Sequence, residues 1–471
     1  MVANPLSDVN PPRYVEGMTG DTTLVILGAS GDLTSRLLLP ALGQLLQREP
    51  ERRLRLHGAA MEDWSDDRWQ QVVRASFASV GAEAAFAHVS ATTYRRADIT
   101  AAADLESVLR DAGDRPILYF AVPPAVTARA CAALTDISVP GQTLLALEKP
   151  FGDDEDSARA LNKLLTQIVP EEQVFRIDHF LGRSTVLNLL GARFANRLLE
   201  PVWSAEHIAS VVIRYDETLG LEGRAGYYDH AGALVDMLQS HLLQVMAVLA
   251  MEPPATLSER DQRDARCAVL RATRLWQDDP VAASRRARYT AGVVQGSDVP
   301  AYVAEPGVDP ARQTETLAEM TCEIRSARWA GVPFTLRSGK AIGARHTEIV
   351  VRFRPVRHLP DGFGGSAEGS VLRFTLGPDE MSLELNINGP GDPLRLDRAA
   401  LVAQLGEGQL LAYGEVLSGI LDGDAALAVR GDAAEESWRI VQPVLDAWRR
   451  GDVPMDEYPA GSGGPASWAA L

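Results

Sequence analysis

Short apolar runs alternate with helical segments through the first third of the chain. Candidate strands lie at 22–27, 54–60, 117–122 and 143–147, with candidate helices between them at 33–47, 69–78, 104–112 and 126–134. Continuous apolarity is typical of strands that are buried on both faces. Because parallel neighbours need long crossovers, the alternation predicts a doubly wound parallel sheet, an α/β fold with helices on both faces.

The pattern changes after about residue 183. A helical stretch runs to about residue 199, and alternating residues then predict strands at 207–215, 347–353, 370–376 and 381–387. Helical patterns cover 232–251, 314–326 and 435–449. We therefore expect an α+β domain with a large, mostly antiparallel sheet and helices. The predicted boundaries are a tail over 1–20, the α/β domain over 21–182 and the α+β domain over 183–471.

A glycine-bearing turn, 28–33, joins the first candidate strand to the first helix. Gly28 allows the tight turn, Gly31 lets the backbone approach a pyrophosphate, and the helix N-terminus offers free N–H groups. The spacing differs from G-x-G-x-x-G, so a turn without a ligand is the alternative. The turn predicts a dinucleotide site and hence a Rossmann-like domain.

The end of the second candidate strand bears on which dinucleotide binds. Glu62 could accept hydrogen bonds from ribose hydroxyls, and residues 58–63 include no Arg or Lys for a 2′-phosphate. Arg36 on the first helix could still reach that region. The segment favours NAD over NADP, and ordinary turn residues are the alternative.

The charge balance limits the class of partner. The formal net charge is -17, which argues against nucleic acid and anionic membranes as partners. An anionic substrate must therefore meet a local cluster of positive groups. Only Lys149, Lys163 and Lys340 are lysines among the 46 basic residues, and Lys149 and Lys340 stand in turn-like contexts. A lysine retained beside so many arginines is a candidate for a specific role.

The three cysteines are widely spaced and form neither a metal-binding pattern nor a disulfide framework. The first 21 residues have no apolar signal core, and polar residues interrupt the apolar segment 232–251. We therefore expect a cytoplasmic protein.

Residues 175–183, FRIDHFLGR, concentrate an acid, an imidazole and two guanidinium groups in an apolar frame. Together with His241 they suggest a base held by a carboxylate beside an anion site. A surface ion pair between Arg176 and Asp178, with His179 in the core, is the alternative.

Two further segments carry candidate chemistry. Lys149 follows the strand at 143–147, where α/β sheets bind ligands, although a surface lysine before a turn is the alternative. Asp236 and His241 are five residues apart, about 140° around an ideal α-helix, and could straddle a ligand. A lone histidine on an apolar helix is often a core residue.

The motifs resemble those of the glucose-6-phosphate dehydrogenase family, in its order and spacing. The matching segments are 28–33, 148–152, 176–182, Glu217, 223–229, 236–244, 331–334, 339–340, 430–432, Trp438 and 461–462. The block RIDHFLG is highly specific to the family. The resemblance implies oxidation of D-glucose 6-phosphate at C1 to 6-phospho-D-glucono-1,5-lactone, with hydride transfer to NAD or NADP. It implies no metal, and a homodimer or homotetramer built on the large sheet.

The resemblance also implies roles for single residues. His241 matches the general base, and Asp178 matches its carboxylate partner. The residues matching substrate contacts are Lys149, His179, Arg183, Glu217, Asp236 and Lys340, with Arg345 as an addition. The expected cofactor contacts are Gly28, Ser30, Gly31, Asp32, Leu33, Arg36, Met61, Glu62, Pro123 and Lys149, with Pro150 at the cofactor hinge.

Three positions depart from the family pattern. The family usually has Tyr and Lys where this chain has Phe180 and Arg183, and an arginine for NADP where it has Met61. Phe180 lacks a hydroxyl donor, whereas Arg183 keeps the charge in a planar fork. The alternatives to the expected enzyme are a paralogue that binds nucleotide or sugar phosphate without turnover, and a dehydrogenase of another hexose.

Overall fold

The computed structural model describes residues 22–221, 223, 225–406, 408 and 410–468, so the predicted tail over 1–20 lies outside it. The described chain forms two compact units. The first comprises 22–148, Lys163–Ile177 and Tyr413–Leu427; the second comprises Lys149–Asn162, Asp178–Ala412 and the described part of 428–471. The chain therefore passes between the units several times, which one boundary at residue 182 does not describe. Unit membership depends on tertiary packing, which local periodicity does not report.

A parallel sheet forms the centre of the first unit. Its strands run in the order β6-β5-β4-β1-β2-β3, with every neighbouring pair parallel. Their bounds are β1 Thr22–Leu27, β2 Leu54–Ala60, β3 Thr93–Arg96, β4 Pro116–Phe120, β5 Leu144–Glu148 and β6 Val174–Ile177. The strand order reverses beside β1, the place where open α/β sheets bind ligands. The Rossmann-like expectation is confirmed.

Helices α1 to α5 connect these strands, and most of α10, which comes much later in the chain, belongs to the same unit. Their bounds are α1 Leu39–Arg48, α2 Asp66–Ala78, α3 Ala102–Ala112, α4 Pro124–Leu134, α5 Glu155–Ile168 and α10 Ala412–Asp422. A π-helical turn, Thr34–Leu38, precedes α1. The start of α2 shows why local sequence is predictive here: Ser65 accepts the Arg68 N–H at 3.2 Å, and Asp66 and Asp67 occupy the first turn.

A large sheet dominates the second unit. Its path is β17-β16-β15-β14-β7-β13-β12-β9-β19, with β8 paired to β12, and only β7–β13 and β9–β19 are parallel among the described pairs. The strands are β7 Ile208–Asp216, β8 Thr273–Leu275, β9 Ser284–Thr290, β12 Leu317–Ile324, β13 Phe334–Gly339, β14 His346–Phe353, β15 Val371–Leu376, β16 Asp379–Asn388, β17 Leu396–Gln404 and β19 Met455–Pro459. Shorter strands are β10 Gly292–Val294, β11 Ser297–Val299 and β18 Ala428–Val429. A mostly antiparallel sheet is confirmed.

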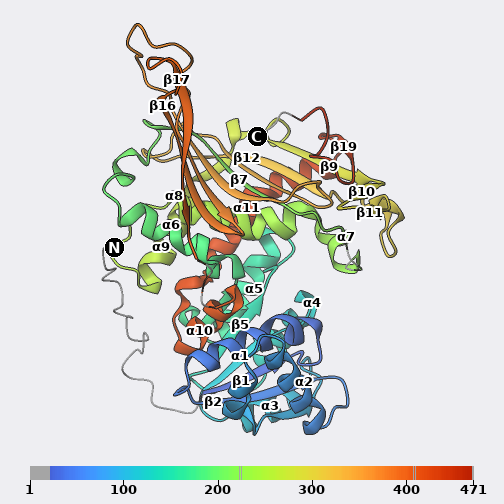
Figure 1. Cartoon of the computed structure of the whole chain (residues 1–471). Coiled ribbons are helices and arrows are strands. Elements are labelled where there is room, and N and C mark those ends of the chain that lie inside the picture. The colour runs from blue at the N-terminus through green and yellow to red at the C-terminus, as the bar shows by residue number, and fades with distance from the viewer. Residues whose placement is uncertain (1–21, 222, 224, 407, 409, 469–471) are drawn as a thin grey trace. The chain divides into compact units, whose positions relative to one another are not determined.

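Helices of the second unit cover one face of this sheet, and β16 and β17 project from it as a long hairpin (Figure 1). The helices are α6 Ser184–Phe194, α7 Ala225–Ala233, α8 Leu243–Ala250, α9 Glu259–Ala272 and α11 Gly431–Arg449, with a π-helix at Leu234–Leu242. In the described parts of both units, 3₁₀ turns lie at Glu83–Val89, Glu171–Gln173, His179–Gly182, Glu200–Val202, Trp276–Asp278, Tyr302–Ala304, Pro310–Arg312 and Ala425–Leu427. The helical run Ala225–Ala250 is apolar enough to span a membrane, but 89% of its apolar window is buried inside the fold, as in a core helix.

The predicted helix at 314–326 is wrong. This segment is β12, which pairs with β13 on one side and with β9 and β8 on the other. Its apolar residues fit both the 3.6-residue period of a helix and the two-residue period of a strand. The fold follows the strand period, since Ala318, Met320, Cys322 and Ile324 are all buried. A central position in the sheet decides the conformation against local helix propensity.

Candidate active site

Asp178 and His241 form a buried pair in the second unit. Asp178 directly follows β6 and caps the 3₁₀ turn His179–Gly182, where its Oδ1 accepts the Phe180 N–H at 3.0 Å. The same oxygen lies 2.5 Å from His241 Nδ1, and the two side chains are 1% and 2% exposed. A hydrogen on Nδ1 leaves the Nε2 lone pair free to take a proton.

The charges of this pair suit a base. Burial alone would raise the pKa of Asp178, but the adjacent His241 imidazole overcomes burial and lowers that pKa to about 2. Burial lowers the pKa of His241 below its usual value, against the opposite effect of Asp178. The carboxylate is therefore ionised and the imidazole neutral near pH 7.

A π-helix brings Asp236 and His241 to the same site. The ideal α-helical geometry expected for this segment is wrong, because Leu234–Leu242 is π-helical. In a π-helix the bonds run from i to i+5, so residues five apart become neighbours. Accordingly, His241 contributes to lowering the pKa of Asp236, and Asp236 acts to raise the pKa of His241.

Lys149 forms a cluster with Asp178, Asp236 and His241, in which it is paired with Asp236. Its Nζ donates to Asp236 Oδ1 at 2.8 Å and to the Asp236 carbonyl oxygen at 2.6 Å. Burial opposes both charges, yet the ammonium lowers the pKa of Asp236 to about 2, and the carboxylate raises the pKa of Lys149. Lys149 is a fixed cation, so the surface-lysine alternative does not describe it.

Aromatic rings hold the imidazole of His241. The Phe180 ring stacks on it with centroids 4.1 Å apart and an interplanar angle of 13°, and the His179 ring approaches at 4.7 Å and 71°. Burial, and then the charge of His241, lower the pKa of His179 well below its usual value. His179 is therefore neutral near pH 7.

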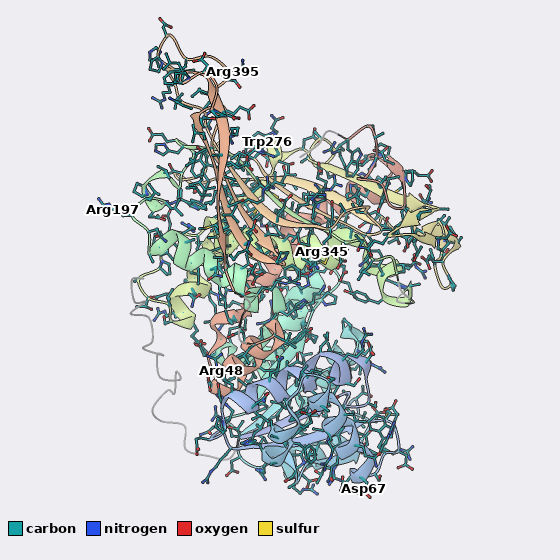
Figure 2. The ribbon with its side chains drawn as sticks, in the orientation of Figure 1. Arg48, Asp67, Arg197, Trp276, Arg345 and Arg395 are labelled. Carbon is teal, nitrogen blue, oxygen red and sulfur yellow. The ribbon has the colours of Figure 1, made fainter. Side chains whose placement is uncertain are left out.

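The remaining predicted substrate residues fall into two groups. Arg183 and Lys340 belong to the cluster through their charges. The charge of Arg183 contributes to the lowered pKa of His179, and the charge of Lys340 contributes to the lowered pKa of Asp236. Lys340 Nζ donates to Glu217 at 2.9 Å. Arg345, labelled in Figure 2, is exposed, and no hydrogen bond or ion pair joins it to the cluster within the described residues.

Glu315 and Gly232 support the π-helix, and sequence reasoning missed both. Gly232 has φ +64°, and a Cβ there would overlap the Glu315 carboxylate. Glu315 accepts the Leu234 N–H at 2.9 Å, and burial raises its pKa to about 7. A glycine before the Asp236 segment and an acid inside an apolar segment were the available signals, but the wrong helix prediction hid the second.

We expect Glu315→Ala to lower the free energy of unfolding by about 1–3 kcal/mol, because it leaves the buried Leu234 N–H without an acceptor. Glu315→Gln keeps an acceptor oxygen and should retain most of the stability. Urea unfolding of both variants measures the difference. Equal losses in the two variants would assign the effect to charge or packing.

Most of the predicted cofactor residues lie in the first unit, in the segments that follow β1, β2 and β4, whereas Lys149 follows β5 and belongs to the second unit. Gly28 has φ +93°, and a Cβ there would overlap the Ala121 carbonyl, so only glycine fits this turn. Ser30 Oγ donates to Glu62 Oε2 at 2.5 Å, which links the first loop to the second. Asp32 pairs with Arg36 at 3.2 Å, an exposed contact. Leu33 precedes the π-helical turn, Met61 is 60% exposed, and Pro123 precedes α4.

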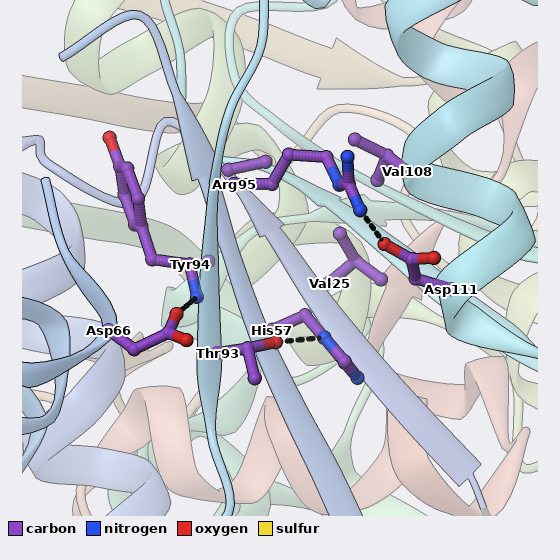
Figure 3. Close-up of a pocket in the computed structure, with 10 residues that line it drawn as sticks. Val25, His57, Asp66, Thr93, Tyr94, Arg95, Val108 and Asp111 are labelled. Atoms are coloured by element: carbon purple, nitrogen blue, oxygen red, sulfur yellow. Dashed lines mark hydrogen bonds and ion pairs between the residues drawn. The ribbon is translucent and has the colours of Figure 1, made fainter. Parts of the chain in front are cut away.

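A separate hollow of about 370 Å³ lies in the same unit, beside β2, β3 and α3 (Figure 3). None of the predicted cofactor residues lines it. Its polar groups bond to each other: Thr93 Oγ1 lies 2.7 Å from His57 Nδ1, and Arg95 pairs with Asp111. The hollow is therefore distinct from the loops around Gly28.

Comparisons with known proteins agree over nearly the whole chain. Residues 25–188 match the glucose-6-phosphate dehydrogenase NAD binding domain, and residues 190–471 match the glucose-6-phosphate dehydrogenase C-terminal domain. The glucose-6-phosphate 1-dehydrogenase of Gluconobacter oxydans is 40% identical over 94% of both chains, and that of Rhizobium meliloti is 36% identical over 95% of both.

Solved structures give the same result. A glucose-6-phosphate dehydrogenase in complex with its substrate glucose 6-phosphate superposes with a TM-score of 0.84 at 28% identity, covering 95% of this chain and 96% of that one. The enzyme from Mycobacterium avium gives 0.81 at 32% identity, with the same coverage. The chain belongs to the glucose-6-phosphate dehydrogenase family.

Proposed function

We propose that the chain oxidises D-glucose 6-phosphate at C1 to 6-phospho-D-glucono-1,5-lactone and passes a hydride to NAD(P)+. The observation that carries this proposal is the buried Asp178–His241 pair beside the Lys149–Asp236 ion pair, in a member of this family. A paralogue without turnover would have no need to keep a neutral imidazole beside an ionised carboxylate in its core.

His241 is the general base in this proposal. Its Nε2 takes the proton of the C1 hydroxyl, while Asp178 holds Nδ1–H and stabilises the imidazolium that forms. The stacked Phe180 ring restricts rotation of the imidazole, so the lone pair keeps one direction. Such positioned proton transfer is worth about 10²- to 10⁴-fold in rate.

Lys149, Asp236 and Glu217 bind sugar hydroxyls. Lys149 has three N–H donors, of which Asp236 accepts two in this structure. Glu217 and Asp236 are acceptors for hydroxyl hydrogens, and each is held by a lysine. The arrangement offers both donors and acceptors, as a polyol requires.

The phosphate is bound by His179, Arg183 and Lys340, with Arg345 as a further contact. Arg183 Nη1 donates weakly to the Leu376 carbonyl at 3.4 Å, and Arg345 lies against the next residue, Gly377. That proximity supports a shared anion site for the two arginines. Because the net charge is -17, such a local cluster is needed to attract a phosphate dianion.

The loops around Gly28 would hold the cofactor, which supplies the hydride acceptor when bound. The Gly28 turn leaves no space for a side chain, as a close backbone approach to a pyrophosphate requires. Pro123, which precedes α4 in the same unit, is a further expected cofactor contact.

The chain uses NAD in preference to NADP. Ser30 donates to Glu62, and this bond lowers the pKa of Glu62. The position after β2 therefore presents an anion that accepts ribose hydroxyls and repels a 2′-phosphate. Arg36 is paired with Asp32 rather than placed beside Glu62.

Met61→Arg should raise kcat/KM for NADP relative to NAD by about 10-fold, since a charged hydrogen bond to phosphate contributes about 1.5–3 kcal/mol. Met61→Leu, which adds no charge, is the matched control and should leave the ratio unchanged. Initial rates with each cofactor give the ratio. An unchanged ratio in Met61→Arg would place selectivity elsewhere, for example at Arg36.

The chain forms a homo-oligomer, a homodimer or homotetramer, through the large sheet. Strand β17 is at the edge of the path, and its Leu401 and Val402 are 62% and 56% exposed. An unpaired, apolar edge is a liability unless a second copy covers it. We place the protein in the cytoplasm, where NAD(P) and sugar phosphates occur.

Steady-state rates with glucose 6-phosphate and with glucose, each with NAD and NADP, test the proposed function. We expect the highest kcat/KM with glucose 6-phosphate. A higher value with glucose would favour the dehydrogenase of another hexose. Folded protein that reduces neither cofactor would favour the paralogue without turnover.

A further inference from the structure

The guanidinium group of Arg183 is held by two aromatic rings. It lies 4.3 Å from the Phe180 ring centroid and 5.2 Å from that of Tyr215, and the two rings meet edge to face at 5.0 Å. Arg183 Nη2 donates to the Tyr215 hydroxyl at 2.9 Å. Cation–π contacts, this hydrogen bond and the weaker one from Nη1 to the Leu376 carbonyl thus hold the cation without a carboxylate partner among the described residues.

The missing carboxylate distinguishes Arg183 from its neighbours in the cluster. Lys149 is paired with Asp236, and Lys340 with Glu217. Arg183 instead keeps its full charge unneutralised, and its Nε is buried with no hydrogen-bond partner within the described residues. A buried, unsatisfied donor on an unpaired cation is suited to an anion that arrives from outside.

The hydroxyl of Tyr215, beside the Arg183 guanidinium, can donate one further hydrogen bond. Its oxygen accepts from Arg183, so its own O–H remains to donate, and no described group accepts it. Donation by a guanidinium polarises the phenol and strengthens the O–H as a donor to an anion. Phe180, the other ring of the pair, has no hydroxyl to offer.

We infer that Tyr215 is a substrate-binding residue, whose hydroxyl donates to the phosphate of the substrate that Arg183 attracts. The inference rests on the proposed function and adds to it a residue on β7 that selects phosphorylated over free sugar. Phe180 has no hydroxyl, and Tyr215, whose ring packs against that of Phe180, supplies one instead.

Tyr215→Phe removes the hydroxyl and keeps the ring. We expect KM for glucose 6-phosphate to rise about 10-fold, kcat to change little, and kcat/KM for glucose to stay unchanged. Inorganic phosphate, as a competitive inhibitor, should lose affinity by a similar factor. A purely structural role of Tyr215 in placing the site would instead change glucose and glucose 6-phosphate alike.

A double variant moves the hydroxyl between the two rings. Phe180→Tyr combined with Tyr215→Phe should recover most of the lost affinity for glucose 6-phosphate and for inorganic phosphate. Tyr289→Phe, which removes a buried hydroxyl bonded to Glu305 in the same unit, is the matched control and should leave KM unchanged.

The outcomes separate this inference from the proposed function. If the wild-type chain does not prefer glucose 6-phosphate over glucose, the proposed function is wrong. If the wild-type chain does prefer glucose 6-phosphate, two results for Tyr215→Phe would show that only the inference on Tyr215 is wrong. One is an unchanged KM with unchanged phosphate inhibition, and the other is an equal loss of kcat/KM for glucose 6-phosphate and for glucose. Should Tyr215→Phe fail to fold, the double variant Phe180→Tyr with Tyr215→Phe is the test. An affinity of this variant for inorganic phosphate well below that of the wild type would overturn the inference on Tyr215.

Discussion

Replacing His241 by Asn should lower kcat by about 10²- to 10⁴-fold while KM for glucose 6-phosphate changes little, because the variant loses only the proton acceptor. The asparagine amide can still donate to Asp178, so the buried carboxylate keeps a partner. Steady-state kinetics with glucose 6-phosphate measure both constants. The expected loss follows from the position of Nε2, the one ring nitrogen that Asp178 leaves free.

His230→Asn is the matched control for this variant. His230 is exposed on α7, and its Nδ1 lies 3.0 Å from the Gly226 carbonyl oxygen in the same helix. It should retain wild-type kcat. If His241→Asn also retained wild-type kcat, the base would have to be another group.

Asp178→Asn should lower kcat by about 10²-fold or more, because the amide no longer stabilises the imidazolium or fixes the Nδ1–H tautomer. The pH profile carries a second expectation. Asp178 raises the pKa of His241 against burial, so its removal should lower that pKa further. The acidic limb of kcat/KM should move to lower pH.

Asp264→Asn provides the control, since Asp264 is exposed and paired with Arg430 outside the cluster. It should leave both kcat and the acidic limb in place. A shift of the limb to higher pH in Asp178→Asn would contradict the charges assigned to the pair.

Four strands of the first unit, β1, β2, β4 and β5, were predictable because each is a local, continuous apolar run. Thr22–Leu27 and Leu54–Ala60 begin and end as the sequence indicates, since apolar runs and turn residues bound them. β3, Thr93–Arg96, was missed because an edge strand with mostly exposed side chains has no apolar pattern. β6, Val174–Ile177, was missed because it contains Arg176, which is buried and paired with Glu171. β12 was misread because its residues fit two periods.

The candidate site divides in the same way. Local motifs led to Asp178, Lys149 and Gly28, where a few adjacent residues carry the chemistry. The partners depend on contacts across long separations, such as Asp178 with His241 and Lys149 with Asp236. Glu315 and Tyr215 carry no motif, and only their place beside Leu234 and Arg183 gives them a role.

The sequence by itself determined the alternating fold of the first unit, the family with the reaction class that it implies, and the candidate site residues, because each of these follows from short segments with characteristic spacing. The tertiary structure decided the protonation of those residues, the π-helical turn that makes Asp236 and His241 neighbours, and the pairing of Tyr215 with Arg183. Burial and contact distances set pKa values and hydrogen bonds, and both arise only when distant segments pack together.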